Sequence, residues 1–216
     1  MLETNCDVVI IGAGASGLAS AWRLSNKNLK IIILEQGKEY KEKDYHKKNP
    51  SWDLDRLNKF HLNPNIRNNL YDYPIDSSNS DIDIANFNGV GGSTLLYSGH
   101  FPRFHPSDFK VKTKDGVGND WPFSYQQLEK YYEINDKING IHGLTNDPAY
   151  PKIKNLKKPV DLGILGKKIA KGFKKLNWHC WPSYSAINVK NNFSVRTVNQ
   201  TYLPLIKYKK NVIIKE

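Results

Sequence analysis

The chain has 216 residues and a formal net charge of +11 at pH 7, with 39% apolar and 12% aromatic residues, enough for a hydrophobic core. Arg supplies only five of the 32 basic residues, so diffuse Lys accounts for the charge, and no nucleic-acid-binding motif accompanies it. We therefore interpret the charge as a solvated surface and expect no nucleic-acid partner; the alternative, charge-driven nucleic-acid binding, would show a steep salt dependence.

Membrane and metal sites are not indicated by the sequence. No apolar stretch approaches the roughly 20 residues that a membrane span requires. Cys6 and Cys180 lie far apart without metal-ligand spacing, so we expect packing roles for both and no metal. The first apolar run begins at Val8, which leaves no room for a signal peptide. We expect a cytoplasmic location, with periplasmic export together with a partner left open.

The first predicted strand runs into a glycine motif. Residues 7–17 read Asp-Val-Val-Ile-Ile-Gly-Ala-Gly-Ala-Ser-Gly, an apolar run that ends in G-x-G-x-x-G. In a dinucleotide-binding βαβ unit, Gly12 lets the chain turn off the strand, Gly14 lets the backbone approach a pyrophosphate, and Gly17 lets helix and strand pack closely. The helix that begins here directs its positive end at the phosphates.

The residues that follow supply the context that this motif needs. Leu18, Ala21, Trp22 and Leu24 predict an amphipathic helix, and residues 31–34 predict a second strand that ends at Glu35. A carboxylate there accepts hydrogen bonds from ribose hydroxyls and repels a 2′-phosphate, which favours FAD or NAD over NADP. This context favours an α/β dinucleotide-binding fold over a tight turn without a ligand.

A long polar stretch covers residues 38–80, where Lys, Asn, Asp and Tyr are interleaved without periodicity. Two interpretations stay open. The stretch is either an extended excursion that covers a cofactor or meets another subunit, or a poorly ordered surface loop.

A second Gly-rich loop occupies residues 87–99. Gly91 and Gly92, followed by Ser93 and Thr94, offer backbone N–H groups and hydroxyls that suit anionic oxygens. One dinucleotide with two phosphates can use two such loops, although this loop alone predicts a plain turn equally well.

Most of the elements predicted after residue 120 are helices. Ser124 and Gln127 form a capping box for a helix that Gly140 ends. A Lys-rich amphipathic helix is expected over 161–176, as an ordinary surface helix, with a membrane-surface role as the less favoured alternative. Another helix is expected over 197–206, and residues 211–216 look like a strand.

Several motifs together resemble a known family. The GAGASG motif with Glu35, the GVGGST loop at 89–94, and the stretches at 101–109 and 116–122 resemble the N-terminal half of glucose/methanol/choline (GMC) oxidoreductases. The likeness is strongest to the branch that includes gluconate dehydrogenase flavoprotein subunits. It covers essentially the whole chain, since residues 196–203 and 211–214 also resemble a family stretch.

The resemblance implies FAD as the cofactor and assigns residues to it. Relatives that attach flavin covalently use a histidine just before the residue matching Tyr97; Leu96 stands there, which implies non-covalent FAD. The residues implied to contact FAD are Gly12, Ala13, Gly14, Ala15, Ser16, Gly17, Glu35, Gln36, Gly91, Gly92, Ser93, Thr94, Tyr97, Ser98 and Gly99.

The resemblance also implies a reaction, the oxidation of a CH–OH group of an alcohol, sugar or sugar acid by hydride transfer to flavin N5. The family's histidine base lies near the C-terminus of full-length relatives, beyond Glu216, so no catalytic residue is assigned. We expect three segments: a βαβ core over 1–37, the polar excursion over 38–80, and a continuation of the FAD domain over 81–216. The substrate-binding and catalytic part would be absent.

Competing functions stay open at this stage. A non-catalytic FAD-binding fragment or assembly subunit that ends at residue 216 is the alternative of a different class. A plain NAD-dependent dehydrogenase is less favoured, because it gives no reason for the second Gly-rich loop or for Asp120-Trp-Pro122. The implied partners are a small alcohol or sugar-type substrate and an electron-acceptor subunit.

Overall fold

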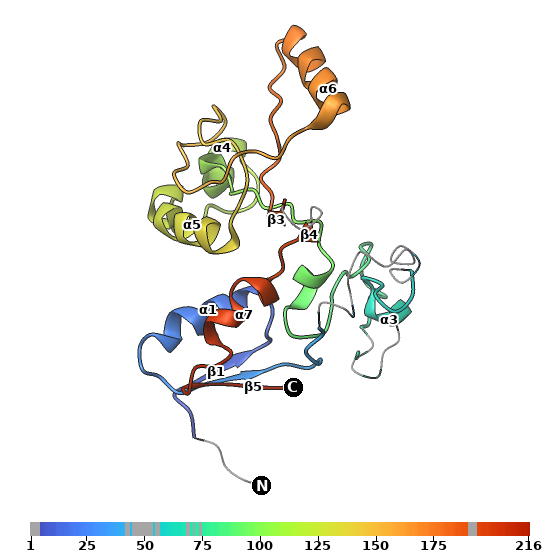
Figure 1. Ribbon diagram of the computed structural model, residues 1–216, viewed down its shortest axis with the longest axis vertical. Helices are drawn as coiled ribbons and strands as arrows, with labels where there is room; N and C mark the ends of the chain where they lie inside the picture. The colour runs from blue at the N-terminus through green and yellow to red at the C-terminus, as the bar shows by residue number, and fades with distance from the viewer. Residues whose placement is uncertain are drawn as a thin grey trace. The chain divides into compact units, whose positions relative to one another are not determined.

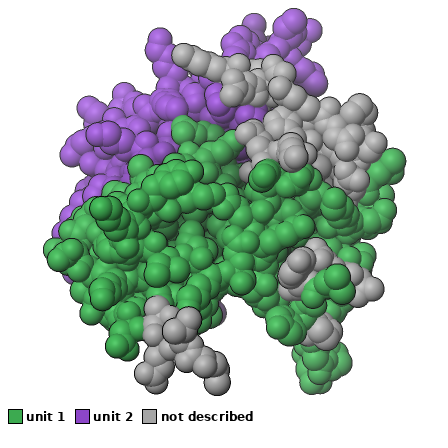
Figure 2. Space-filling model, turned by 60° about the horizontal axis from the view of Figure 1, so that its bottom comes forward, with its two compact units in different colours: residues 1–98, 196–216 green, residues 99–195 purple. Residues whose placement is uncertain are grey.

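A computed structural model describes residues 5–41, 44, 54, 57–67, 70, 72–73, 75–189 and 194–216. The chain divides into two compact units, coloured separately in Figure 2. The first unit comprises residues 1–98 and 196–216, and the second comprises residues 99–195. The polypeptide therefore leaves the first unit after Ser98 and returns to it at Arg196.

The first unit is built on a three-stranded parallel sheet with the strand order β1-β2-β5. Strand β1 (Val8–Ile11) pairs with β2 (Ile31–Leu34), which pairs with β5 (Val212–Lys215). Parallel neighbours need a crossover, and helix α1 (Ala15–Ser25) supplies it between β1 and β2. The βαβ unit and the strand at 211–216 predicted from the sequence are confirmed.

The two faces of this sheet differ. Ile31 and Ile33 are buried on the face that contacts α1, where α1 and the short helix α7 (Leu203–Ile206) lie side by side (Figure 1). On the other face Ile11 is 79% exposed, and Val9 and Ile213 are about half exposed. Ile32, which lies between Val9 and Ile213 on this face, is buried, so the exposed apolar part is on the outer strands. Parallel sheets are normally covered on both faces, and the described residues leave this part uncovered.

The loops of the first unit have a core of their own. Tyr40, Phe60, Phe87, Leu95 and Leu96 form a buried cluster. This cluster fixes the segment before the 3₁₀ helix η2 (Gly92–Leu95) against part of the polar excursion, which also includes the short helix α3 (Pro64–Arg67). Tyr40 and Phe60 of the excursion are therefore packed, whereas Leu57, Leu70 and Tyr73 are largely exposed. Both interpretations given for the stretch stay predictions.

The second unit is mainly helical. It contains the 3₁₀ helix η3 (Pro106–Lys110) and the helices α4 (Val111–Asp115), α5 (Tyr125–Asn139) and α6 (Gly163–Lys175). A two-stranded antiparallel sheet joins β3 (Ile187–Asn188) to β4 (Ser194–Val195). The predicted capping box is present, because the backbone N–H of Ser124 donates to Gln127 Oε1 at 2.8 Å.

A buried ion pair crosses the core of the second unit. The Arg103 guanidinium donates through Nε and Nη2 to Asp136 Oδ2 at 2.9 and 2.6 Å, and through Nη1 to the Tyr125 hydroxyl at 3.0 Å. Burial raises the pKa of Asp136, and the hydrogen bonds from Arg103 oppose that effect. The pair connects α5 to the loop before η3, so it fixes the fold of this unit.

The predicted helix over 197–206 is wrong as a single element. The structure has a 3₁₀ helix η4 (Val198–Gln200), a break at Thr201, and then α7. Pro204 lacks a backbone N–H and is favoured in the first turn of a helix, so a new helix starts there. No helix of the described residues is long and apolar enough to span a bilayer.

The two compact units do not follow the segment boundaries at 37 and 80 that the sequence suggested. The three segments expected from the sequence, 1–37, 38–80 and 81–216, were defined by function and not by compactness, so they stay a prediction.

Candidate functional site

A cleft of about 500 Å³ lies in the first unit at the carboxyl ends of β1 and β2. This edge of a parallel sheet is where α/β proteins bind ligands. The cleft combines both Gly-rich loops with the end of β2. It is lined by Ile11, Gly12, Gly14, Ala15, Ser16, Gly17, Leu34, Glu35, Gln36, Asn86, Phe87, Asn88, Gly92, Ser93 and Thr94.

The first Gly-rich loop presents the N-terminus of α1 to the cleft. Gly14 is the residue before the helix, in an extended conformation, and a Cβ added there would meet no atom within 4 Å. Gly17 differs, since a Cβ there would overlap the carbonyl oxygen of Gly12. Gly17 therefore allows α1 to approach β1, whereas Gly14 leaves open space beside N–H groups that carry partial positive charge.

Glu35 is held at the rim of the cleft by backbone donors. Its Oε2 accepts from the N–H of Ala13 at 2.6 Å and its Oε1 accepts from the N–H of Gly37 at 3.0 Å. Each carboxylate oxygen has two lone pairs, so both oxygens keep acceptor capacity for a further donor. The carboxylate is thus oriented in advance for hydroxyl groups that enter the cleft.

The two Gly-rich loops are joined directly. The N–H of Gly91 donates to the carbonyl oxygen of Ala13 at 2.8 Å, and Thr94 Oγ1 donates to the carbonyl oxygen of Gly91 at 2.6 Å. Gly91 has a backbone φ of +106°, which residues other than glycine rarely adopt. The second loop therefore takes its shape from a backbone turn that brings it against the first.

The returning chain supports the second loop from behind. Asn199 Nδ2 donates to the carbonyl oxygen of Val90 at 2.9 Å, and the N–H of Val198 donates to Thr94 Oγ1 at 3.3 Å. A Cβ at Gly91 would overlap Asn199 Oδ1. Residues more than a hundred positions later in the sequence thus determine the shape of this loop.

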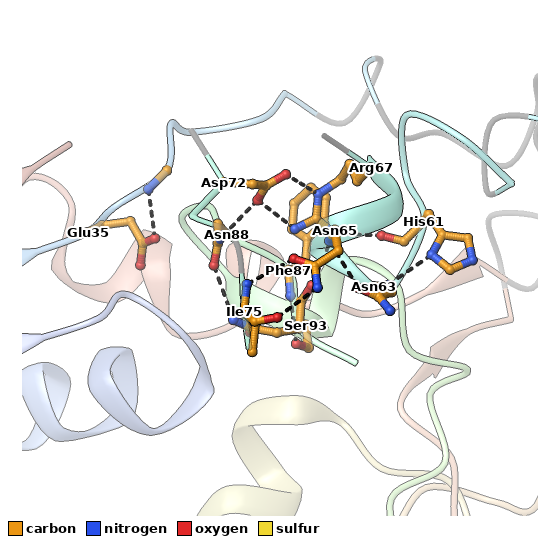
Figure 3. A network of polar contacts seen from close by, with 12 residues as sticks. Glu35, His61, Asn63, Asn65, Arg67, Asp72, Ile75, Phe87, Asn88 and Ser93 are labelled. Carbon is orange, nitrogen blue, oxygen red and sulfur yellow. Dashed lines mark hydrogen bonds and ion pairs between the residues drawn. The ribbon is translucent and has the colours of Figure 1, made fainter. Parts of the chain in front are cut away.

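A polar network, shown in Figure 3, connects the excursion to the cleft wall. Arg67 donates from Nε and Nη2 to the two carboxylate oxygens of Asp72 at 2.7 and 2.6 Å, and from Nη1 to the carbonyl oxygen of Asn86 at 3.0 Å. Asn88 Nδ2 donates to Asp72 Oδ1 at 2.7 Å, and the guanidinium lies over the Phe87 ring. Residues 86–88 line the cleft, so this buried ion pair positions part of its wall.

Sequence reasoning missed the wall residues Asn86, Phe87 and Asn88, and the pair behind them. Arg67 is one of only five arginines, but Arg56 lies in the same stretch, so rarity alone does not single out Arg67. Nothing in the spacing of Arg67 and Asp72 distinguishes a buried pair from two surface charges.

The expected site residues are distributed in three ways. Gly12, Gly14 to Gly17, Glu35, Gln36 and Gly92 to Thr94 line the cleft, while Ala13 and Gly91 form the hydrogen bond between its loops. Tyr97 and Ser98 belong to the first unit but are not lining residues. Gly99 is the first residue of the second unit, where its carbonyl oxygen accepts from the N–H of Ala186 at 2.7 Å.

Tyr97 has a structural partner. Its hydroxyl donates to the carbonyl oxygen of Arg196 at 2.6 Å, which joins the chain where it leaves the first unit to the chain where it returns. Burial raises the pKa of Tyr97 to about 12, against the lowering effect of the Arg196 charge. The phenol is therefore neutral and acts as a hydrogen-bond donor at physiological pH.

The described histidines have structural partners. His105 stacks on Tyr150, His142 Nδ1 is 2.7 Å from the carbonyl oxygen of Lys158, and His179 Nε2 is 2.9 Å from Asp147 Oδ1. His46 lies outside the described residues. Within the described ranges no three His, Cys, Asp or Glu side chains are grouped so that they could hold a metal ion.

A second pocket of about 410 Å³ lies in the second unit. Aromatic rings form most of its wall, with Phe173 contributed by α6. Its lining residues are His100, Pro102, Tyr150, Phe173, His179, Cys180, Trp181, Ser183 and Tyr184.

Comparisons with known proteins agree with the geometry of the cleft. Residues 7–44 match a family model described as FAD dependent oxidoreductase. The chain is 36% identical over 185 residues to 2-methyl-1,2-propanediol dehydrogenase of Mycolicibacterium austroafricanum, with 84% of this chain and 33% of that protein covered. It is 28% identical to the fructose dehydrogenase large subunit of Gluconobacter japonicus, with 68% and 30% covered.

Solved structures share the fold. The crystal structure of pyridoxine 4-oxidase from Mesorbium loti superposes on this chain with a TM-score of 0.61 at 20% sequence identity. The superposition covers 97% of this chain and 42% of the oxidase chain. The chain spans a third or less of the length of these curated relatives.

Proposed function

Since the homologues of this chain are GMC oxidoreductases, whose N-terminal part it matches, we propose that it is the FAD-binding part of an enzyme that oxidises a CH–OH group. The observation that carries the proposal is the cleft, in which two Gly-rich loops and a pre-oriented carboxylate converge at the carboxyl edge of a parallel sheet. The substrate is a small alcohol, sugar or sugar acid.

The residues present fit FAD. A pyrophosphate needs backbone N–H groups that a side chain does not shield, and the open space at Gly14 beside the N-terminus of α1 provides them. Ribose hydroxyls need an acceptor, and Glu35 retains acceptor capacity on both oxygens. Gly92, Ser93 and Thr94 face the same cleft and would contact the rest of the pyrophosphate and the ribityl chain.

Bound FAD would supply a hydride acceptor, and the chain supplies binding and orientation. Glu35 orients the adenosine end, and the positive end of α1 stabilises the phosphate charge. Tyr97, Ser98 and Gly99 are proposed to approach the isoalloxazine. Leu96 is buried in the core cluster and carries no nucleophile, which supports non-covalent attachment. No described histidine is assigned the role of proton acceptor.

The finer assignments are also proposals. The similarity to a fructose dehydrogenase large subunit supports an electron-acceptor subunit as a partner. A cytoplasmic location, periplasmic export with a partner, and the gluconate dehydrogenase branch stay predictions.

The test is reductive titration of the full-length protein under anaerobic conditions. Flavin released by heating would be identified by chromatography as FAD, and simple diols, sugars and sugar acids would be added in turn while flavin absorbance is followed. Bleaching by one of these classes supports the proposal. FAD release without bleaching by any of them would favour a non-catalytic FAD-binding subunit, and absence of FAD would contradict the proposal.

A further inference from the structure

Helix α6 is amphipathic, yet no residue in it is buried. Figure 1 shows it in orange at the end of two long connecting segments, away from α4 and α5 of the same unit. Phe173 is its main attachment, since this ring lines the second pocket and stacks on Trp178 at 5.7 Å. The sequence predicts an ordinary surface helix here, which would bury its apolar side, and the structure leaves that side exposed.

The exposed side is a continuous apolar stripe. With about 3.6 residues per turn, Leu165, Ile169 and Leu176 fall on one side of the helix. Leu165 is 70% exposed, Ile169 50% and Leu176 60%, and Trp178 just beyond the helix is 62% exposed. A surface helix normally buries such a stripe, whereas the described residues leave this one uncovered.

The charge around the stripe has one sign. By the same period Lys167, Lys171 and Lys174 fall on the opposite side of the helix, and Lys168 and Lys175 flank the stripe. The sequence contains no Asp or Glu from Leu162 to Lys215, and among the described residues Lys167 pairs with Asp161 at 2.8 Å. The partner must therefore accept apolar side chains and offer many negative charges along a length of about 20 Å, at 1.5 Å per residue.

We propose that α6 docks on the surface of a membrane that contains anionic lipids. A helix of this kind lies in the interface with its apolar side among the acyl chains and its lysines at the headgroups. Trp178 adds an aromatic side chain of the type that favours the interface. A second copy packed stripe to stripe would bring the flanking Lys168 and Lys175 of both chains together without an acidic partner on α6, so the charge disfavours self-association through this face.

The proposal is independent of the cleft, because none of these residues lines it. It also requires no membrane-spanning segment, since α6 has 13 residues and would lie parallel to the bilayer.

The experiment is sedimentation of the full-length protein with vesicles made of equal parts phosphatidylcholine and phosphatidylglycerol, compared with vesicles of phosphatidylcholine alone. We expect sedimentation with the anionic vesicles that weakens as salt is added. Lys171→Gln combined with Lys174→Gln should weaken binding about fivefold for each lysine removed. Ile169→Asn should also weaken vesicle binding, because it replaces an apolar side chain of the stripe by a polar one.

The matched controls are on α5, which has similarly exposed residues. Lys130→Gln with Lys137→Gln, and Ile134→Asn, should leave vesicle binding unchanged. Circular dichroism would establish that each variant is folded. A folded protein that does not sediment with anionic vesicles overturns the proposal, as does equal loss of binding in the α5 variants. Protection of α6 from trypsin without lipid would also overturn it, because another part of the protein or a second copy would then cover the helix.

Discussion

Each unit contains a buried Arg–Asp pair, but Glu35 of the first unit stands in a different setting from Asp136 of the second. In the first unit Glu35 stands at the rim of an open cleft, fixed by two backbone N–H groups and with acceptor capacity left over. In the second unit Asp136 lies in the core with its charge met by Arg103. The difference is that Glu35 is oriented toward the cleft with capacity for a ligand, whereas Asp136 is used entirely by the interior of its own unit.

The largest expected effect separates two glycines of one loop. Gly17→Ala should displace α1 from β1, because a Cβ there overlaps the Gly12 carbonyl oxygen, so FAD binding and the stability of the first unit should both be lost. Gly14→Ala places its methyl in open space and should leave stability unchanged while weakening FAD binding. Thermal unfolding and FAD titration of both variants check this, and equal destabilisation by both would show that Gly14 is structural.

The next comparison is between the two buried ion pairs. Arg103→Met should destabilise the second unit by about 3–5 kcal/mol, because Asp136 is left buried without its partner. Arg67→Met should cost the first unit a similar amount and also weaken FAD binding, since residues 86–88 lose their support. Urea unfolding and FAD titration would measure the two effects. An FAD affinity that falls equally in both variants contradicts the separation of roles.

A smaller effect is expected at the rim of the cleft. Glu35→Gln keeps the shape but removes the charge, and it replaces one acceptor by a donor that faces a backbone N–H. Hydrogen bonds to charged groups contribute about 1.5–3 kcal/mol, so FAD affinity should fall roughly tenfold to hundredfold. Fluorescence titration with FAD measures this. An unchanged affinity would remove Glu35 from the proposed site.

The smallest effect concerns Tyr97 and pH. Tyr97→Phe should lower stability by about 1 kcal/mol at neutral pH through the lost hydrogen bond to Arg196. The pKa of Tyr97 is raised to about 12, so its contribution is complete below pH 10, the usual pKa of a tyrosine, and decreases as pH rises toward 12. The stability difference between the two proteins should therefore shrink above about pH 10. A difference that stays constant to pH 11 contradicts the raised pKa.

The parts of the fold that local patterns encode could be predicted from the sequence. The G-x-G-x-x-G motif after a β-branched strand predicts β1, α1 and β2 because each glycine has a distinct steric task. Ser124, Gln127 and Gly140 predict both ends of α5 because capping is local chemistry. In the same way, the glycines and hydroxyls of both loops indicated most of the cleft.

The rest depends on contacts between distant residues. The hydrogen bond from Asn199 to Val90 and the ion pair of Arg67 with Asp72 have no periodic signature, so no pattern of residues indicates that they lie at the cleft. Helix α6 shows that a clear local pattern can also be insufficient. Its period predicts an amphipathic helix correctly, but the period does not say whether its apolar side faces the core of the protein or a partner.

The measurement that tests the central claim most directly is competition for FAD binding. Because the cleft offers a pyrophosphate loop and a ribose acceptor, it should bind the ADP half of FAD. ADP is therefore expected to compete with FAD, FMN is not, and Gly14→Ala should weaken FAD and ADP together. Competition by FMN with no effect of ADP, or affinities that Gly14→Ala leaves unchanged, would contradict the assignment of this cleft to FAD.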